Sequence, residues 1–231
     1  MFSADKDRMF LMTLMTNARK GWARTLGLAG ATFMAACMAL PAQAASSDAE
    51  RLTSLLEPLK TYSADFNQQV ASGGGSLQNA SGHMWLSRPG RFNWKVSDPY
   101  RQTVVSDGQK VYLYDPDLEQ VSIRPLDQRV THTPALLLSG QASELTENYN
   151  VSRRQQGTTE FFALSPRSND SLFESLELVF NNERLSGIDL TDGTGQRTEI
   201  SFRNIEVNPD ISASHFQFKI PDGADVMREG N

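Results

Sequence analysis

Apolar and polar residues alternate along most of the chain after residue 60, which is the pattern of β-strands with one buried face. Asp107-Gly108 and the run 192–195 are tight-turn sequences that join neighbouring strands. About eleven strands in hairpin order, with no spacing for βαβ units, predict a mainly β (α+β) chain built on a meandering antiparallel sheet. We expect strands at residues 62–71, 81–87, 91–97, 101–106, 110–114, 118–124, 150–156, 160–165, 175–181, 187–191, 199–207 and 216–220.

Two segments have helical spacing of their apolar residues instead. In residues 48–60, Asp48 is a candidate N-cap, and Pro58 should break or kink the last turn. Thr133 followed by Pro134 provides the cap and the first residue of a second short helix. Leucines occupy the apolar positions: Leu52, Leu55, Leu56 and Leu59 in the first segment, and Leu136, Leu137 and Leu138 in the second.

A sheet with this many strands twists and curls around one face. An apolar inner face then leaves a space that the two helices could plug or cover. Leucines at helical spacing most often complete a core, so the pattern by itself favours a packed core over a ligand cavity.

The start of the chain has the order of a secretory signal peptide, with basic, then apolar, then small residues. Basic residues up to Arg24 precede an apolar run over 26–40, and Ala42-Gln43-Ala44 is an Ala-x-Ala cleavage signal. The apolar run is shorter than the roughly 18 residues that a membrane-spanning helix needs. We therefore expect a signal peptide over 1–44, a single domain over 45–231, and a periplasmic location.

Cys37, the only cysteine, follows Met34-Ala35-Ala36, which loosely resembles the lipobox of bacterial lipoproteins. The Ala-x-Ala site fits better, so we favour a cleaved, cysteine-free protein without disulfide or thiol chemistry. The whole chain has a net charge of −5 and no basic block, and loss of a basic leader makes the rest more acidic. Nucleic acid and anionic membrane surfaces are therefore poor partners.

Sequence signatures of an enzyme or a metal site are missing. The three histidines, His83, His132 and His215, lie far apart, and there is no G-x-S-x-G motif. The glycine-rich run 73–76 lacks the lysine and the helix of a phosphate-binding loop. Asp115-Pro116-Asp117 is a turn rather than a calcium loop. We expect no catalytic residues, no metal and no cofactor.

The stretch from Trp85 to Trp94, W-L-S-R-P-G-R-F-N-W, carries two tryptophans and a phenylalanine around an Arg-Pro corner. Pro89 fixes its own φ and pushes Arg88 out of the helical region, so Arg88 should lie at a strand corner. This aromatic cluster, with no reactive group nearby, indicates a protein that holds something apolar.

These residues resemble the LolA family of periplasmic carriers of outer-membrane lipoproteins. The matching features are W-x-x-R-P-x-x-F-x-W over 85–94, S-D-G-Q-K-V-Y-L-Y-D-P-D-L-E-Q over 106–120, the Thr133-Pro134 helix start, and F-x-F-x-I-P-D-G-A-D-V over 216–226. The resemblance implies an incomplete antiparallel β-barrel of eleven strands, with helices forming a lid over its open side. It also implies a monomer that accepts triacylated lipoproteins from an inner-membrane ABC transporter and delivers them to an outer-membrane receptor.

The same resemblance implies roles for single residues. Arg88 would tether the lid by hydrogen bonds to helix carbonyls, and Phe92 would take part in cargo handling. The implied acyl-chain cavity and lid residues are Phe92, Trp94, Tyr112, Tyr114, Leu136, Leu137, Leu138, Leu176 and Leu178, with Leu52, Leu55 and Leu56 from the first helix.

Two alternatives stay open from the sequence. A chain with lipidated Cys37 would be the outer-membrane receptor lipoprotein of the same system. A generic periplasmic apolar-ligand-binding barrel, or an enzyme on a similar barrel, would need no lipoprotein machinery.

Overall fold

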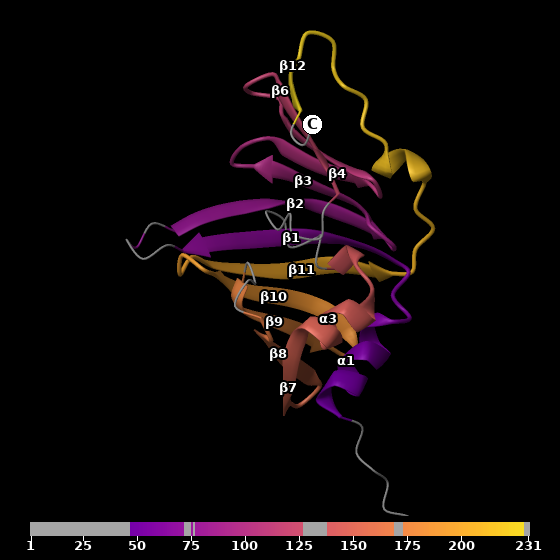
Figure 1. The fold of residues 1–231 in the computed structure, drawn as a ribbon, viewed down its shortest axis with the longest axis vertical. Coiled ribbons are helices and arrows are strands. Elements are labelled where there is room, and N and C mark those ends of the chain that lie inside the picture. The colour runs from indigo at the N-terminus through magenta and orange to yellow at the C-terminus, as the bar shows by residue number, and fades with distance from the viewer. Residues whose placement is uncertain (1–46, 72–74, 76, 127–137, 169–172, 229–231) are drawn as a thin grey trace, which may run out of the picture. The chain divides into compact units, whose positions relative to one another are not determined.

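The computed structural model describes residues 47–228 except 72–74, 76, 127–137 and 169–172, all within one unit, Ala44–Asn231. In this part of the chain, twelve strands form one sheet (Figure 1). The helices are α1 (Asp48–Leu56), α3 (Ala142–Asn148) and a short 3₁₀ helix, η1 (Ala213–Phe216). The strands are β1 (Thr61–Ala71), β2 (Leu77–Ser87), β3 (Arg91–Asp98), β4 (Gln102–Asp107), β5 (Lys110–Asp115), β6 (Gln120–Pro125), β7 (Tyr149–Gln156), β8 (Thr159–Pro166), β9 (Phe173–Asn181), β10 (Arg184–Asp192), β11 (Arg197–Val207) and β12 (Asp225–Arg228).

The sheet is built from two runs of hairpins that meet in its middle. Its order is β12-β6-β5-β4-β3-β2-β1-β11-β10-β9-β8-β7, so β12 and β7 are the two edges and the sheet does not close. β1 to β6 lead outward to one edge; the chain then passes to the other edge and returns from β7 to β11, beside β1. All the pairs are antiparallel except β12 with β6. The predicted incomplete antiparallel barrel is thereby confirmed.

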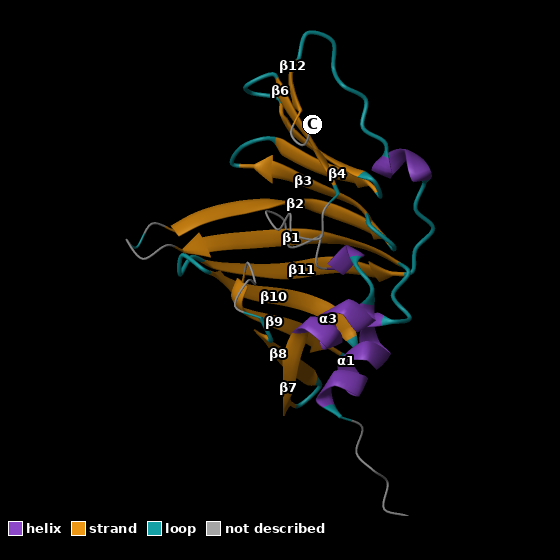
Figure 2. Cartoon of the chain, viewed as in Figure 1, coloured by secondary structure: helices purple, strands orange, loops and turns teal. Residues whose placement is uncertain are grey.

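The two faces of the sheet differ in composition, as the alternation of the sequence predicts. On one face, which we call the helix-covered face, Tyr62, Phe66 and Trp94 pack with the α1 leucines Leu52 and Leu56 in one buried core. Figure 2 shows α1 and α3 in purple beside the end of the sheet that contains β7, whereas η1 lies near β3 and β4. The opposite face, which we call the outer face, carries mostly polar side chains. Burial of the apolar face therefore drives both the curl and the docking of the helices.

The helix ends follow from capping chemistry. Ser47, rather than the predicted Asp48, is the N-cap of α1: its hydroxyl accepts the Glu50 N–H at 3.2 Å, while the Glu50 carboxylate accepts the Ser47 N–H at 2.8 Å. The helix ends at Leu56, two residues before Pro58, in line with the predicted break. The helix α3 was not predicted, because only two of its seven residues, Ala142 and Leu145, are buried apolar positions.

The last part of the chain corrects one predicted strand. Residues 217–220 form no ladder; instead, the segment from 208 to 224 crosses the outer face and leads to β12 at the far edge. Its contacts there include a hydrogen bond from Asn93 Nδ2 to the carbonyl oxygen of His215 at 2.8 Å. Phe216 and Phe218 alternate with polar residues because both rings pack on the outer face of the sheet, and not because the segment pairs with a strand. The prediction of a strand at 216–220 from this alternation was therefore wrong.

Several predictions fall outside the described residues. They concern the signal peptide over 1–44 with Cys37, and the start of the second helix with Leu136 and Leu137; Leu138 and Ser139 are helical. Of the helices that are described, none is long and apolar enough to cross a membrane.

Candidate functional site

Arg88 lies in the turn between β2 and β3 and joins two segments that are distant in the sequence. Its Nη1 donates to the carbonyl oxygen of Leu56 at 2.7 Å, and its Nε donates to that of Leu138 at 2.8 Å. Leu56 is the last residue of α1, whose final carbonyls have no partner within the helix. A single guanidinium therefore connects the end of α1 to the helical residues around 138.

The position of Arg88 is electrostatically costly for a cation. Burial lowers the pKa of the Arg88 guanidinium to about 10, so the side chain still carries its charge near neutral pH. Its third nitrogen, Nη2, is buried and has no hydrogen-bond partner. Hydrogen bonds to charged groups contribute roughly 1.5–3 kcal/mol each, and a buried donor without a partner opposes part of that gain. The two bonds and the cost of burying the charge therefore oppose each other in this contact.

A second hydrogen bond from the same turn supports this contact. The Gly90 N–H donates to the carbonyl oxygen of Ser139 at 3.0 Å. Gly90 has a φ of +73°, which glycine adopts without strain, and its own carbonyl accepts from Ser106 Oγ at 2.6 Å. The sequence did not lead us to predict a role for Gly90. Its position directly after Arg88-Pro89, in the same turn, could have indicated one.

Most of the predicted apolar site residues meet on the helix-covered face. Phe92 and Trp94 are 1% and 4% exposed, and the Trp94 ring stacks on Phe66 at a centroid distance of 3.8 Å. The other predicted site residues that belong to this core are Leu52, Leu56, Leu138, Leu176 and Leu178, and Leu55 packs against it partly buried. Their burial shows that the protein's own side chains fill this space in the structure.

Tyr112 and Tyr114 do not belong to this group, which corrects their assignment to the cavity. Across the ladders, Phe92 lies opposite Ser106, whereas Tyr112 lies opposite Val105, so Tyr112 points to the outer face. There the Phe218 ring covers both tyrosines, at centroid distances of 5.4 and 5.7 Å. In β5 both parities are apolar, so alternation could not decide which residues face inward.

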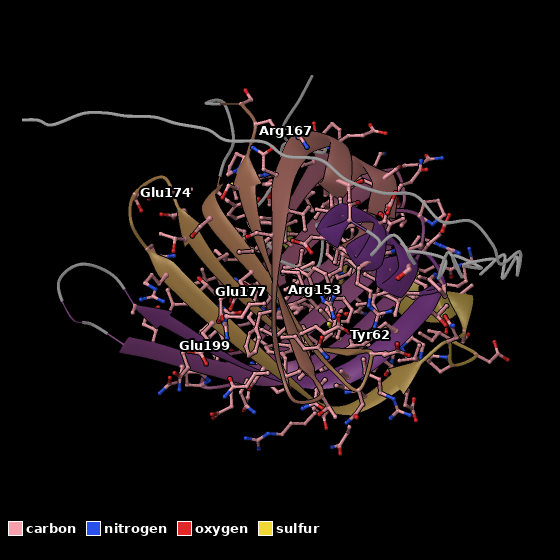
Figure 3. The ribbon with its side chains drawn as sticks, turned by 90° about the horizontal axis from the view of Figure 1, so that it is seen from below. Tyr62, Arg153, Arg167, Glu174, Glu177 and Glu199 are labelled. Carbon is pink, nitrogen blue, oxygen red and sulfur yellow. The ribbon has the colours of Figure 1, made fainter. Side chains whose placement is uncertain are left out.

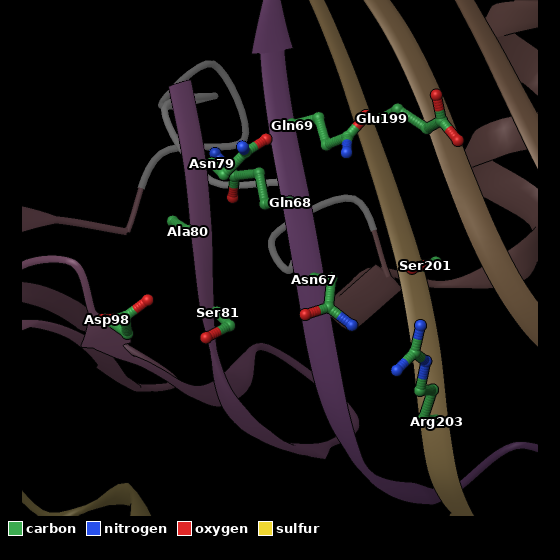
Figure 4. Close-up of a pocket in the computed structure, with 10 residues that line it drawn as sticks. All are labelled: Asn67, Gln68, Gln69, Asn79, Ala80, Ser81, Asp98, Glu199, Ser201 and Arg203. Carbon is green, nitrogen blue, oxygen red and sulfur yellow. The ribbon is translucent and has the colours of Figure 1, made fainter. Parts of the chain in front are cut away.

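Two hollows of about 330 and 480 Å³ lie on the outer face, and their linings mix polar and apolar side chains. Figure 4 shows the smaller one, with Asn67, Gln69 and Asn79 on β1 and β2 and Arg203 on β11. Charged side chains interrupt both linings, among them Arg203 in the smaller hollow and Asp189 in the larger one, so neither offers the continuous apolar surface that an acyl chain requires. The candidate site is therefore the helix-covered core and not an open pocket.

The larger hollow contains a row of three carboxylates. Asp189 lies directly opposite Glu177 on β9 and Glu199 on β11, both labelled in Figure 3. Burial, together with the charges of Glu199 and Glu177, raises the pKa of Asp189 to about 6. Among the described residues, no group of three or more His, Cys, Asp or Glu side chains is arranged to hold a metal ion.

Comparison with known proteins places the chain among lipoprotein carriers. Residues 57–219 match the family model described as outer membrane lipoprotein carrier protein LolA. An outer-membrane lipoprotein carrier protein of Chromohalobacter salexigens is 63% identical over 212 residues, covering 90% of this chain and 97% of that protein. One of Pseudomonas syringae pv. syringae is 50% identical over 191 residues, covering 82% of this chain and 92% of that protein. A solved LolA superfamily protein from Nitrosomonas europaea has a TM-score of 0.47 at 10% identity, covering 74% of this chain and 97% of that chain. The chain belongs to the LolA family of outer-membrane lipoprotein carrier proteins.

Proposed function

We propose that this protein carries triacylated lipoproteins across the periplasm as a monomer, with their acyl chains held in the helix-covered core. It takes them from an inner-membrane ABC transporter and passes them to an outer-membrane receptor. The observation that carries the proposal is the bridge from Arg88 to Leu56 and Leu138 beside an apolar core whose chemistry suits acyl chains. The names of its relatives support the same role.

The magnitudes fit an exchange between a closed empty state and an open loaded state. The two Arg88 bonds together contribute roughly 3–6 kcal/mol. Burial of one methylene group is favourable by about 0.8 kcal/mol, so about four to eight shielded methylenes offset both bonds. Acyl chains of a lipoprotein exceed that number, and they can therefore displace the lid and occupy the space beside Phe92 and Trp94.

The same magnitudes explain why partners are needed. An acyl chain in a bilayer is as well shielded as one in the protein, so it leaves the membrane too slowly unaided. ATP hydrolysis by the transporter supplies the loading step, and the carrier needs no nucleotide, metal, cofactor or catalytic residue of its own. Closure by Arg88 competes with cargo binding, so the carrier has only a moderate affinity for its lipoprotein. A receptor with a higher affinity for the acyl chains can therefore take the lipoprotein from it.

Processing of the leader belongs to the proposal. Cleavage after Ala44 gives a protein that begins at residue 45 in the periplasm, whereas a lipidated Cys37 would give a membrane-anchored receptor. Mass spectrometry of the protein from the periplasmic and membrane fractions separates the two.

The test of the carrier role uses inner-membrane vesicles with the transporter, a labelled triacylated lipoprotein, ATP and the purified protein. We expect ATP-dependent appearance of a soluble one-to-one complex of lipoprotein and carrier. Release without ATP would indicate a generic apolar-ligand binder. No release, with the protein itself acylated in membranes, would show the receptor instead.

A further inference from the structure

An ion cluster fixes the helix α1 to the sheet, and its centre is Glu160 on β8. Glu160 is only 5% exposed, and its carboxylate lies between two guanidinium groups. Arg51 of α1 donates to Oε1 from Nη2 at 2.6 Å and to Oε2 from Nε at 3.1 Å, and Arg153 Nε lies 2.6 Å from Oε2. Figure 3 shows the strands curving around the helix, with Arg153 labelled near the middle of the view. A bidentate, charge-assisted pair of this kind fixes direction as well as distance.

The charges in this cluster balance. Arg51 Nη2 also donates to Glu183, in the turn between β9 and β10, at 2.9 Å. The cluster therefore contains two cations and two anions: Arg51, Arg153, Glu160 and Glu183. The hydrogen bonds from Arg51 lower the pKa of Glu160, so the buried carboxylate stays ionised at neutral pH.

The beginning of α1 has an additional anchor on the edge of the sheet. Asp48 Oδ2 accepts the backbone N–H of Arg153 on the edge strand β7 at 2.9 Å. Side-chain contacts of α1 thus reach β7, β8 and the turn after β9. These contacts do not involve Arg88.

The helical residues around 138 are held differently. Their carbonyls accept from Arg88 Nε, through Leu138, and from the Gly90 N–H, through Ser139. Both donors belong to the turn between β2 and β3, so a movement of residues 138 and 139 away from this turn breaks both bonds. The same movement leaves α1 with its Leu56 contact to Arg88 and with the Glu160 cluster.

We propose that Glu160 is a positioning residue that holds α1 as the stationary wall of the cargo site, so that opening moves the residues around Leu138 and not α1. The proposal rests on the proposed lipoprotein-carrier function for its biological meaning. Acyl chains then enter between the fixed Leu52 and Leu56 and the displaced Leu138. One-sided opening keeps half of the apolar lining in place for the incoming chain, and preorganisation of this kind favours binding.

Hydrogen exchange measured by mass spectrometry on the full chain tests the clamp without any cargo. Glu160→Gln should speed exchange in residues 51–56 by about tenfold, because it removes the charge shared by both guanidiniums, and leave residues 138–141 within about twofold. Arg88→Leu should do the reverse. Asp117→Asn is the matched control, since it breaks an exposed pair with Arg101 far from the helices.

The exchange rates of these variants decide whether α1 moves independently of residues 138–141. If Glu160→Gln leaves exchange in α1 unchanged, or if Arg88→Leu opens α1 and residues 138–141 together, α1 is not an independent wall. Should Glu160→Gln fail to fold, Glu183→Gln removes only the exposed arm of the cluster, and a smaller, selective rise in α1 exchange is then expected; no rise would overturn the proposal. Arg51→Lys, which keeps the charge, should restore part of the protection lost in Arg51→Ala.

A labelled triacylated lipoprotein supplies the functional readout. Loaded Glu160→Gln protein should lose its cargo faster than wild type, while Asp117→Asn should not. If wild-type protein takes up no lipoprotein, the carrier function fails, whereas the exchange results still decide whether α1 is clamped.

Discussion

Replacement of Arg88 by leucine removes the guanidinium that links Leu56 and Leu138 while keeping an apolar side chain at the turn. The hydrogen bonds at 2.7 and 2.8 Å both disappear. If cargo displaces the residues around 138, as we propose, the bond to Leu138 exists only in the closed, empty state. The substitution therefore destabilises the closed state and leaves the loaded state nearly unchanged, and cargo should bind more tightly and leave more slowly.

The size of the effect follows from the bond that opening breaks. If α1 stays in place, only the bond to Leu138 is lost on opening, and a hydrogen bond to a charged group contributes roughly 1.5–3 kcal/mol. Since 1.4 kcal/mol corresponds to a factor of about ten, the apparent affinity for cargo should rise about tenfold to a hundredfold. Burial of the charge and the unpartnered Nη2 oppose the closed state, which favours the lower end of this range.

The assay measures transfer of a labelled lipoprotein from loaded carrier to membranes that contain the receptor. Arg88→Leu should accept cargo but deliver it at least about tenfold more slowly than wild type. Arg101→Leu removes an exposed arginine from a distant turn and should deliver normally. Delivery by Arg88→Leu at the wild-type rate, or weaker cargo binding, would refute the idea that Arg88 closes the empty protein.

Three further predictions concern other parts of the sheet. Burial and Glu199 raise the pKa of Asp189 to about 6, so between about pH 4 and 6 the folded chain keeps a proton that the unfolded chain loses, and stability declines as pH rises. Asp189→Asn should therefore raise the free energy of unfolding above about pH 6 and flatten its fall between about pH 4 and 6. Denaturant titrations that show an unaltered pH profile would contradict this. Gly82→Ala should lower the free energy of unfolding by roughly 1–3 kcal/mol in urea titrations, because a Cβ there would lie 1.9 Å from the carbonyl oxygen of Lys95. An unchanged free energy of unfolding would show that β2 and β3 can move apart to accommodate the methyl group. Tyr114→Ala should leave lipoprotein uptake unchanged, as its ring packs on the outer face; lost uptake without lost stability would return it to the cargo site.

The sequence predicts the strands well, because one face of each must be apolar and the other polar. The Asp107-Gly108 hairpin and the helix ending before Pro58 follow from local chemistry, and the structure has both. A short helix with few apolar residues, such as α3, has too few of them for their spacing to indicate a helix. Where both faces of a strand are covered, as in β5 with Tyr112 and Phe218, periodicity cannot tell inside from outside.

Long-range polar contacts were beyond sequence reasoning for a different reason. Arg51 and Glu160 are 109 residues apart, and nothing in either neighbourhood distinguishes them from surface charges. Only the return of the chain from β7 to β11 brings β8 under α1. Arg88 could be identified from its family motif. Its partners could not, because they are the backbone carbonyls of Leu56 and Leu138, and any residue type can supply a backbone carbonyl.

The most direct test of the central claim maps where the acyl chains lie in the loaded protein. A lipoprotein with a photoreactive group on an acyl chain is loaded by the transporter and ATP, illuminated, and the cross-linked peptides are identified. We predict cross-links to residues of the helix-covered face, such as Phe92, Trp94 and Leu138. Cross-links confined to the outer face, at Tyr112 or in its two hollows, would contradict this position of the acyl chains.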